Sequence, residues 1–338
     1  MILQSFSSLI GQYLWIAALA AVVAHFTLNY FTPGVRKIPG PFLAKFTNLW
    51  RFYDVWKGRN DLTLNALHHK YGDNVRLGPN VSKFYAVQQQ MANGKPTVTL
   101  FTSLSEQWHA NIKRPIANAY SMTTLTDFEP FVDNMIALMF SRLDALFATT
   151  TNTSSHDRPP PTCPLFDWLQ FYAFDVIGEL TCSHDLGFLS TGRDMSNIIR
   201  DLNATMDYNA LVGQLPWLDH LLIKNPLRQL LLGANAATGP VARFARARLD
   251  ERLLEREKGV EKPRRDFMAR FFEVKETHPA VVDDKQVFSL LEIYKLLPSL
   301  FLRYDIQLVD PKAEWKITNS WFARQEGVEF HLTRRMDV

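Results

Sequence analysis

The sharpest cluster of reactive side chains lies between Trp108 and Pro115, in the string Trp-His-Ala-Asn-Ile-Lys-Arg-Pro. On a helix, His109 and Lys113 are four residues apart and share a face. Both side chains donate hydrogen bonds to anionic oxygens, so the pair suits a ligand that carries a carboxylate. The alternative is an ordinary surface patch with Trp108 in the core, and the spacing alone favours that alternative.

Two acids interrupt an apolar stretch between Phe171 and Thr181. Asp175 and Glu179 are four residues apart, as a pair of catalytic carboxylates would be on one helical face. Acids at this spacing are more often capping or exposed residues, so we predict no catalytic residue here.

The chain has two cysteines, Cys163 and Cys182, and no CxxC or Cys/His cluster with zinc spacing. We expect this part of the chain to lie in the cytosol, where a disulfide is not the default state of two cysteines. The sequence therefore predicts no metal site built from these side chains.

Helices dominate the elements that must position these residues. Apolar side chains at three and four spacing predict helices over residues 46–71, 105–120, 127–147, 165–181, 195–212, 240–258 and 290–302. In the helix 127–147 the predicted buried stripe is Phe131, Met135, Leu138, Met139 and Leu146. In the helix 240–258 charges of both signs alternate, which is typical of a solvated face.

Strands are few. Residues 74–79 form one expected short strand, and the alternating segments 302–308 and 328–332 form a strand-bearing end around a turn at Gly327. Residues 149–161 are polar and end in prolines, which predicts a loop. The expected fold is mainly α with a small β portion.

An uncharged apolar stretch at residues 9–31 predicts a membrane anchor. It is long enough to cross a hydrocarbon core of about 30 Å. A cleaved signal peptide is the alternative, but such peptides begin with basic residues, and the first charges here are Arg36 and Lys37. Their position after the span predicts that the body of the protein faces the cytosol. A broken apolar segment, residues 211–223, either lies in the membrane interface or packs in the core.

Composition narrows the classes of function. The 338 residues are 47% hydrophobic and 12% aromatic, which allows a sizeable core. A net charge of +3 with interleaved signs argues against a nucleic-acid partner. Sequons at Asn80, Asn152 and Asn203 matter only if the body lies on the other side of the membrane.

In their order along the chain, these pieces resemble a fungal microsomal cytochrome P450, and most closely the pisatin-demethylase-like enzymes. The anchor followed by Ile-Pro-Gly-Pro at residues 38–41 resembles the membrane helix and proline hinge of that family. The segment 108–115 resembles its haem-propionate helix, and this resemblance implies that His109, Lys113 and Arg114 contact haem propionates. Residues 174–180, 266–271 and 291–298 resemble further helices, and the tail to Arg335 resembles the terminal sheet.

Family motifs around the catalytic centre are absent from the sequence. The family's F-x-x-G-x-x-x-C-x-G loop supplies the thiolate ligand of haem iron. Neither cysteine here is followed two residues later by glycine. The A-G-x-[DE]-T stretch is missing, and the single E-x-x-R string, residues 261–264, contains a proline and is expected to be a loop. In the family, the counterparts of residues 284–289 and 290–292 flank the catalytic centre, whereas here the two segments follow each other directly. The sequence thus predicts a large excision at this point and a second, smaller one near residues 81–82.

The resemblance implies three parts of the chain. Residues 1–36 form a membrane anchor, residues 37–289 form the N-terminal part of a P450-like domain, and residues 290–338 form the C-terminal helix and strands of the same domain. It implies a haem-thiolate monooxygenase of the endoplasmic reticulum membrane that oxidises a hydrophobic small molecule in secondary metabolism, with a reductase partner that passes on electrons from NADPH. We expect this chain itself to be inactive. The alternatives are a non-catalytic, membrane-anchored interaction protein of the same fold and an incomplete gene product.

Overall fold

The computed structural model describes residues 2–79, 87–92, 95–117, 121–149, 161–233, 240–259, 266–277, 304–310, 312, 315–319 and 323–334. The chain divides into two compact units, which we describe separately. The first contains residues 1–88, 206–226 and 318–324, and the second contains the remainder. Four predictions concern residues outside the described part of the chain: the excision near residues 81–82, the helix 290–302, residues 150–160 of the loop 149–161, and the string 261–264.

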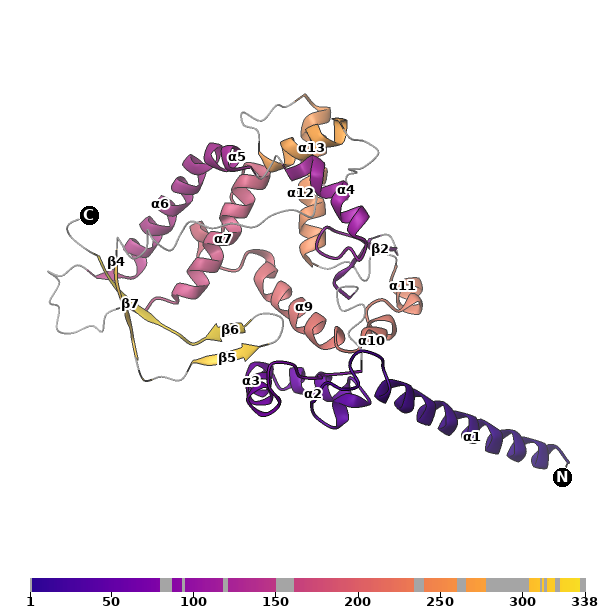
Figure 1. Ribbon diagram of the computed structural model, residues 1–338. Helices are drawn as coiled ribbons and strands as arrows, with labels where there is room; N and C mark the ends of the chain where they lie inside the picture. Colours follow the sequence, from indigo (N-terminus) through magenta and orange to yellow (C-terminus); the bar gives the residue numbers. More distant parts are fainter. Residues whose placement is uncertain are drawn as a thin grey trace. The chain divides into compact units, whose positions relative to one another are not determined.

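The first unit begins with the long helix α1 (Ile2–Tyr30), as the apolar stretch predicts (Figure 1). Its window Tyr13–Tyr30 has a mean hydropathy of 1.4, and none of that window is buried inside the protein. The helix is therefore a candidate membrane anchor by length and composition.

The prediction of a single helix over residues 46–71 was wrong. A short 3-10 turn, η1 (Leu43–Lys45), precedes two helices, α2 (Leu49–Trp56) and α3 (Asn60–Tyr71). Gly58 lies between them with φ of +75°, a left-handed conformation that ends α2 and that glycine adopts without steric cost. The Gly58 carbonyl accepts a hydrogen bond from the backbone N–H of Asn319 at 2.7 Å.

The predicted strand over residues 74–79 was also wrong, and Arg76 gives the physical reason. Its backbone N–H donates to the carbonyl of Pro39 at 2.7 Å, so the segment pairs with the proline hinge rather than with a strand. The buried Arg76 guanidinium donates to the carbonyls of Asn29 and Tyr30, at 2.7 and 3.4 Å, and so caps the end of α1. A side chain on Gly40 would clash with the Arg76 carbonyl oxygen, which explains a glycine within the hinge.

The second unit is built mainly from helices. They are α4 (Glu106–Ile116), α5 (Met122–Asp127), α6 (Glu129–Leu146), α7 (Leu165–Cys182), α8 (Phe188–Thr191), α11 (Pro226–Leu232), α12 (Pro240–Glu257) and α13 (Phe267–Thr277). Helices α6 and α7 lie side by side and supply much of one apolar core (Figure 1). The boundary between the units falls within α9 (Ile198–Val212), and α10 (Pro216–Leu221) belongs to the first unit.

Most helix predictions are confirmed, with differences at particular residues. The helix predicted from Met195 is interrupted at its start: the turn η4 (Met195–Asn197) contains positive φ at Ser196 and Asn197, and the regular helix begins at Ile198. In α6, Met139 is fully buried, but Leu146 was wrongly placed in the buried stripe and is exposed. The last turn of α6 leads into a strand, where the helical periodicity no longer applies.

The strand-bearing end is confirmed. Strand β4 (Tyr304–Leu308) pairs antiparallel with β7 (Phe330–Arg334), and β7 pairs parallel with the short β3 (Ala148–Thr149). Two two-stranded sheets complete the described strands: β1 (Gln90–Ala92) with β2 (Lys95–Thr97), and β5 (Lys316–Asn319) with β6 (Ala323–Glu326). The described part of the chain is thus mainly helical with a small β portion, as predicted.

The sheet of β3, β7 and β4 is tied to α6 by Tyr304, whose side chain is fully buried. Its hydroxyl donates to a carboxylate oxygen of Asp144 at 2.9 Å and lies 3.3 Å from the carbonyl of Phe140. The Tyr304 and Phe140 rings also meet edge to face. Residues far apart in the sequence therefore form one packed core.

Candidate functional site

Helix α4 carries the candidate ligand-binding residues, and its start is fixed by a cap. The Ser105 hydroxyl accepts a hydrogen bond from the backbone N–H of Trp108 at 3.3 Å, which satisfies one of the free donors of the first turn. Ile112 and Ile116 are buried on the inner face, and Trp108 packs against the same core. The helix predicted at residues 105–120 is confirmed as far as Ile116.

The three predicted site residues lie on the more accessible part of this helix. His109 is half-buried, whereas Lys113 and Arg114 are exposed. The helix brings His109 and Lys113 onto one face, one turn apart, and Arg114 lies on the neighbouring face. Among the residues that the structure describes, none of these three side chains forms a hydrogen bond or an ion pair. Their chemistry suits the acidic groups of a ligand.

Asp175 has a structural role. Its side chain is fully buried and accepts hydrogen bonds from the backbone N–H groups of Leu186, Phe188 and Leu189, at 2.9, 3.1 and 2.7 Å. These donors belong to the first turn of α8 and the residues before it, so Asp175 caps one helix from the middle of another. Burial raises the pKa of the Asp175 carboxyl, and the three N–H donors oppose that rise.

The pairing of Asp175 with Glu179 as catalytic acids therefore finds no support. The Asp175 carboxylate faces backbone donors, and it is closed to solvent. Gly178, which lies between the two acids, allows close packing of the same turn: a side chain there would meet the Leu186 side chain at 2.6 Å. The apolar, acid-containing segment is explained by the capping of α8.

A second buried charge cluster was missed by sequence reasoning. The fully buried carboxylate of Asp266 pairs with the Arg252 guanidinium of α12 and accepts hydrogen bonds from the Ser183 hydroxyl at 2.6 Å and the Ala269 N–H at 2.8 Å. It thus joins the end of α7 and the start of α13 to α12. Arg252 was predicted to lie on a solvated face, and this was wrong, because its periodic position among other charges carried no sign of burial.

Neither cysteine is placed as a thiolate ligand. Cys163 is fully buried, and its backbone N–H and carbonyl both pair with Phe330 of β7, at 2.8 and 3.0 Å. Burial raises the pKa of the Cys163 thiol from 9.0 to about 12, with the nearby Asp167 charge adding to the rise. Cys182, the last residue of α7, borders a cavity of about 30 Å³, which is the room of a single water molecule.

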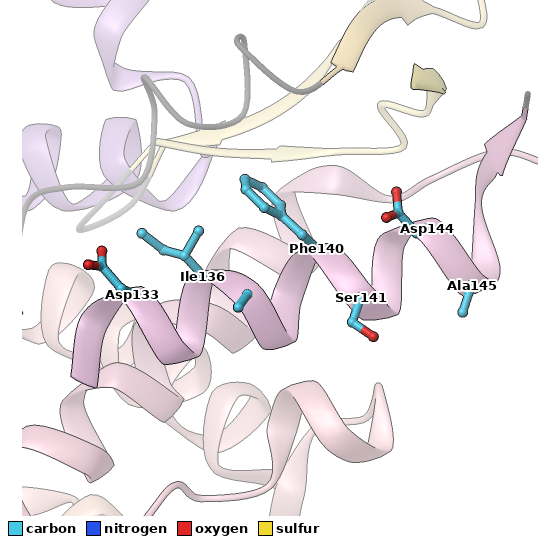
Figure 2. A pocket seen from close by; sticks show the side chains of 7 residues that line it. Asp133, Ile136, Phe140, Ser141, Asp144 and Ala145 are labelled. Carbon is cyan, nitrogen blue, oxygen red and sulfur yellow. The ribbon is translucent and has the colours of Figure 1, made fainter. Parts of the chain in front are cut away.

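A larger open groove of about 700 Å³ follows one side of α6 (Figure 2). Its described lining residues all come from that helix, with Ile136 and Phe140 as the apolar floor and Asp133 and Asp144 toward its ends. The Asp144 carboxylate is already engaged by Tyr304, and it lies 3.5 Å from the Arg334 guanidinium. The groove therefore offers an apolar surface without a free catalytic pair.

Comparison with curated proteins identifies relatives of this chain. A cytochrome P450 monooxygenase of Aspergillus terreus is 36% identical over 270 residues, which are 72% of this chain and 52% of that protein. The cytochrome P450 monooxygenase cicH of Emericella nidulans is 36% identical over 269 residues, 73% of this chain and 52% of that protein. The cytochrome P450 monooxygenase mpaDE of Penicillium brevicompactum is 31% identical over 291 residues, 78% of this chain and 33% of that protein. No protein-family model matches the chain.

The three relatives are all named cytochrome P450 monooxygenases, a class of haem-dependent enzymes, and the mainly helical fold with its apolar first helix accords with that class. The chain belongs to the fungal cytochrome P450 family. It spans about half the length of the first curated relatives that it matches.

The residues of this chain fit the family's haem only in part. The basic side chains of α4 suit the propionates of a haem. The axial position requires a deprotonated cysteine, and Cys163 is closed to solvent and holds its proton to high pH, while the cavity beside Cys182 has no room for a macrocycle. The donor set present does not fit a thiolate-ligated haem.

Proposed function

We propose that this chain derives from a haem-thiolate monooxygenase that oxidises a hydrophobic small molecule in fungal secondary metabolism, and that the chain as given does not catalyse this reaction. The family relationship supports the first half of the proposal. The second half rests on the cysteines, because an activated oxygen species at haem iron depends on the electron donation of an axial thiolate. Neither Cys163 nor Cys182 offers that ligand.

The proposal gives α4 a residual binding role. His109 and Lys113 face the same side, and Arg114 is exposed beside them, so they would hold haem propionates if a haem were bound. Their contribution is to orient the cofactor through charge-assisted hydrogen bonds. They supply no ligand to iron.

An absorption spectrum of the full-length protein, reconstituted with haem, reduced and exposed to carbon monoxide, tests the proposal. We expect no thiolate-type Soret band. The variants Cys163→Ser and Cys182→Ser serve as matched controls, and neither should change the spectrum. A thiolate-type band that disappears in either variant would refute the proposal.

Location follows from the anchor and its flanking charges. We propose a single-pass protein of the endoplasmic reticulum membrane with its body in the cytosol, because Arg36 and Lys37 follow α1 directly. In this topology the sequon at Asn203 and its two counterparts remain unmodified. A mobility shift that glycosidase treatment removes would reverse the orientation. An NADPH-dependent reductase in the same membrane is the partner that the family relationship suggests.

A second candidate is a non-catalytic, membrane-anchored interaction protein. Exposed leucines in α11 favour it: Leu230 and Leu231 each expose 81% of their surface, and Leu227 and Leu232 are also exposed. Exposed apolar patches of this kind mark interaction surfaces. Pull-down of the full chain and of a form lacking residues 1–36, each with a haem assay, distinguishes the candidates. Specific recovery of a reductase or a full-length monooxygenase by haem-free protein supports the interaction role.

A shortened gene product accounts for the missing motifs as well. Transcript sequencing across the codons for Ser82 and for residues 288–291 addresses this directly. A longer reading frame that contains the family's cysteine loop would restore the proposed oxygenase activity to the full protein.

A further inference from the structure

Arg51 is a buried arginine whose guanidinium has no partner among the described residues. It is only 8% exposed, and its Nε atom is closed to solvent and makes no hydrogen bond. Within the described part of the chain, its guanidinium forms neither a hydrogen bond nor an ion pair. Asp54, one turn further along α2, is already satisfied by Lys57, Asn60 and Thr63. Burial also lowers the pKa of Arg51, which shows how unfavourable its charge is without a partner.

Arg51 lines a cavity of about 450 Å³ within the first unit. The other walls come from the last turns of α1, including His25 and Asn29, and from residues 213–217 before and within α10. None of the described lining residues is acidic. A side-chain oxygen of Asn48, beside Arg51, is also buried without a donor. A ligand with an anionic group and a neighbouring hydroxyl would satisfy both residues.

The position of the cavity at the end of α1 favours a lipid as the source of that group. If α1 crosses the membrane, about 20 of its residues fill the hydrocarbon core, which brings its last turns to the level of the headgroups. Trp217 also lines the cavity and is 58% exposed, and exposed Leu221 and Leu222 follow it in or beside α10. An exposed tryptophan with neighbouring leucines is favoured in the membrane interface.

We propose that the cavity binds the headgroup of an anionic phospholipid, with the Arg51 guanidinium on its phosphate. A guanidinium matches the geometry of a phosphate through two parallel hydrogen bonds. The bound lipid would fix the angle between α1 and the rest of the first unit, because the cavity is shared between α1 and the α2 segment. This site is separate from α4; it rests on the membrane location proposed above and not on the proposed catalytic history of the chain.

Thermal unfolding of the full-length protein in nanodiscs tests the proposal. Phosphatidylinositol is the probe, because it carries both a phosphate and hydroxyl groups, and phosphatidylcholine is the reference lipid. We expect phosphatidylinositol to raise the Tm of the wild-type protein by about 2–4 °C, the shift that a ligand of moderate affinity produces in a domain of this size. Arg51→Met should remove this rise.

Arg59→Met is the matched control, because Arg59 lies in the same unit, pairs with Asp61 at 3.2 Å and does not line the cavity. It should keep the full rise. An equal rise in the Arg51 variant, or none in the wild type, would overturn the proposal. An equal rise in phosphatidylcholine discs on adding inorganic phosphate would assign the site to a free anion instead and overturn the lipid assignment.

A measurement on the wild-type protein alone covers the case in which the Arg51 variant fails to fold. Native mass spectrometry of protein released from mixed discs reports which lipid stays bound. We expect phosphatidylinositol to be retained over phosphatidylcholine by about ten-fold, which corresponds to about 1.4 kcal/mol. Equal retention of the two lipids would contradict the proposal.

Discussion

Asp266 in the second unit and Arg51 in the first are both buried ions, but their surroundings differ. Asp266 meets a guanidinium, a hydroxyl and a backbone N–H, all supplied by its own chain. Arg51 meets none of these among the described residues. A buried charge is costly unless it is paired and hydrogen-bonded. The Asp266 carboxylate therefore stabilises the fold, whereas the Arg51 guanidinium indicates a partner outside the chain.

The largest effect should come from breaking the satisfied cluster. Arg252→Met leaves the Asp266 carboxylate buried without its ion pair, and removal of one partner costs about 3–5 kcal/mol of unfolding free energy. Urea unfolding of the detergent-solubilised protein measures the loss. Arg246→Met is the control, because Arg246 pairs with Asp250 on the exposed part of the same helix and should change stability by less than about 1 kcal/mol. Equal losses would mean that burial of the pair does not matter.

Asp175→Ala should have the next largest effect. The substitution leaves three N–H groups near α8 without an acceptor, and each unsatisfied buried group costs about 1–3 kcal/mol. We expect a total loss of about 3 kcal/mol, since the region relaxes and admits water. Asp185→Ala, nearby and only half-buried, should cost less than about 1 kcal/mol. A neutral result for Asp175→Ala would mean that α8 does not depend on this cap.

The clusters around Asp266 and Asp175 show what can and cannot be predicted from the sequence. Apolar periodicity correctly located α6, α7 and the strands β4 and β7, because burial of an apolar face repeats along an element. Long-range pairs such as Ser183 with Asp266 leave no such repeat. Local reasoning likewise placed His109 and Lys113 on one helical face, but it could not find Arg51, since its lack of a partner is a property of the folded surroundings.

The close packing around Gly178 in the second unit predicts a smaller loss of stability. Gly178→Ala would bring a methyl group to 2.6 Å from the Leu186 side chain and 2.9 Å from the His184 carbonyl oxygen. Overpacking of this kind costs about 1–3 kcal/mol. Ala173→Ser on the exposed side of the same helix should cost less than about 1 kcal/mol. Thermal unfolding of both variants shows whether α7 and the turn before α8 are as closely packed as the distances indicate.

The buried Cys163 thiol should make stability depend on pH only in the alkaline range. Its pKa is raised to about 12 in the folded protein, so the thiol keeps its proton where an unfolded thiol, with a pKa of 9.0, ionises. The contribution of this thiol to stability should therefore be constant below about pH 8 and fall as the pH rises toward 12. At pH 8, iodoacetamide should modify Cys182 before Cys163, as peptide mass spectrometry would show. Faster modification of Cys163 would contradict its burial.

Arg51→Met should have the smallest effect on the unfolding free energy. In phosphatidylcholine discs the substitution removes a buried charge that has no partner in the described protein, so it should change the unfolding free energy by less than about 1 kcal/mol or increase it. The same replacement at Arg252 costs several times more, although both side chains are about equally buried. A loss of about 3 kcal/mol at Arg51 without anionic lipid would show that the charge already has a partner in the protein, and the two buried arginines would then belong to one class.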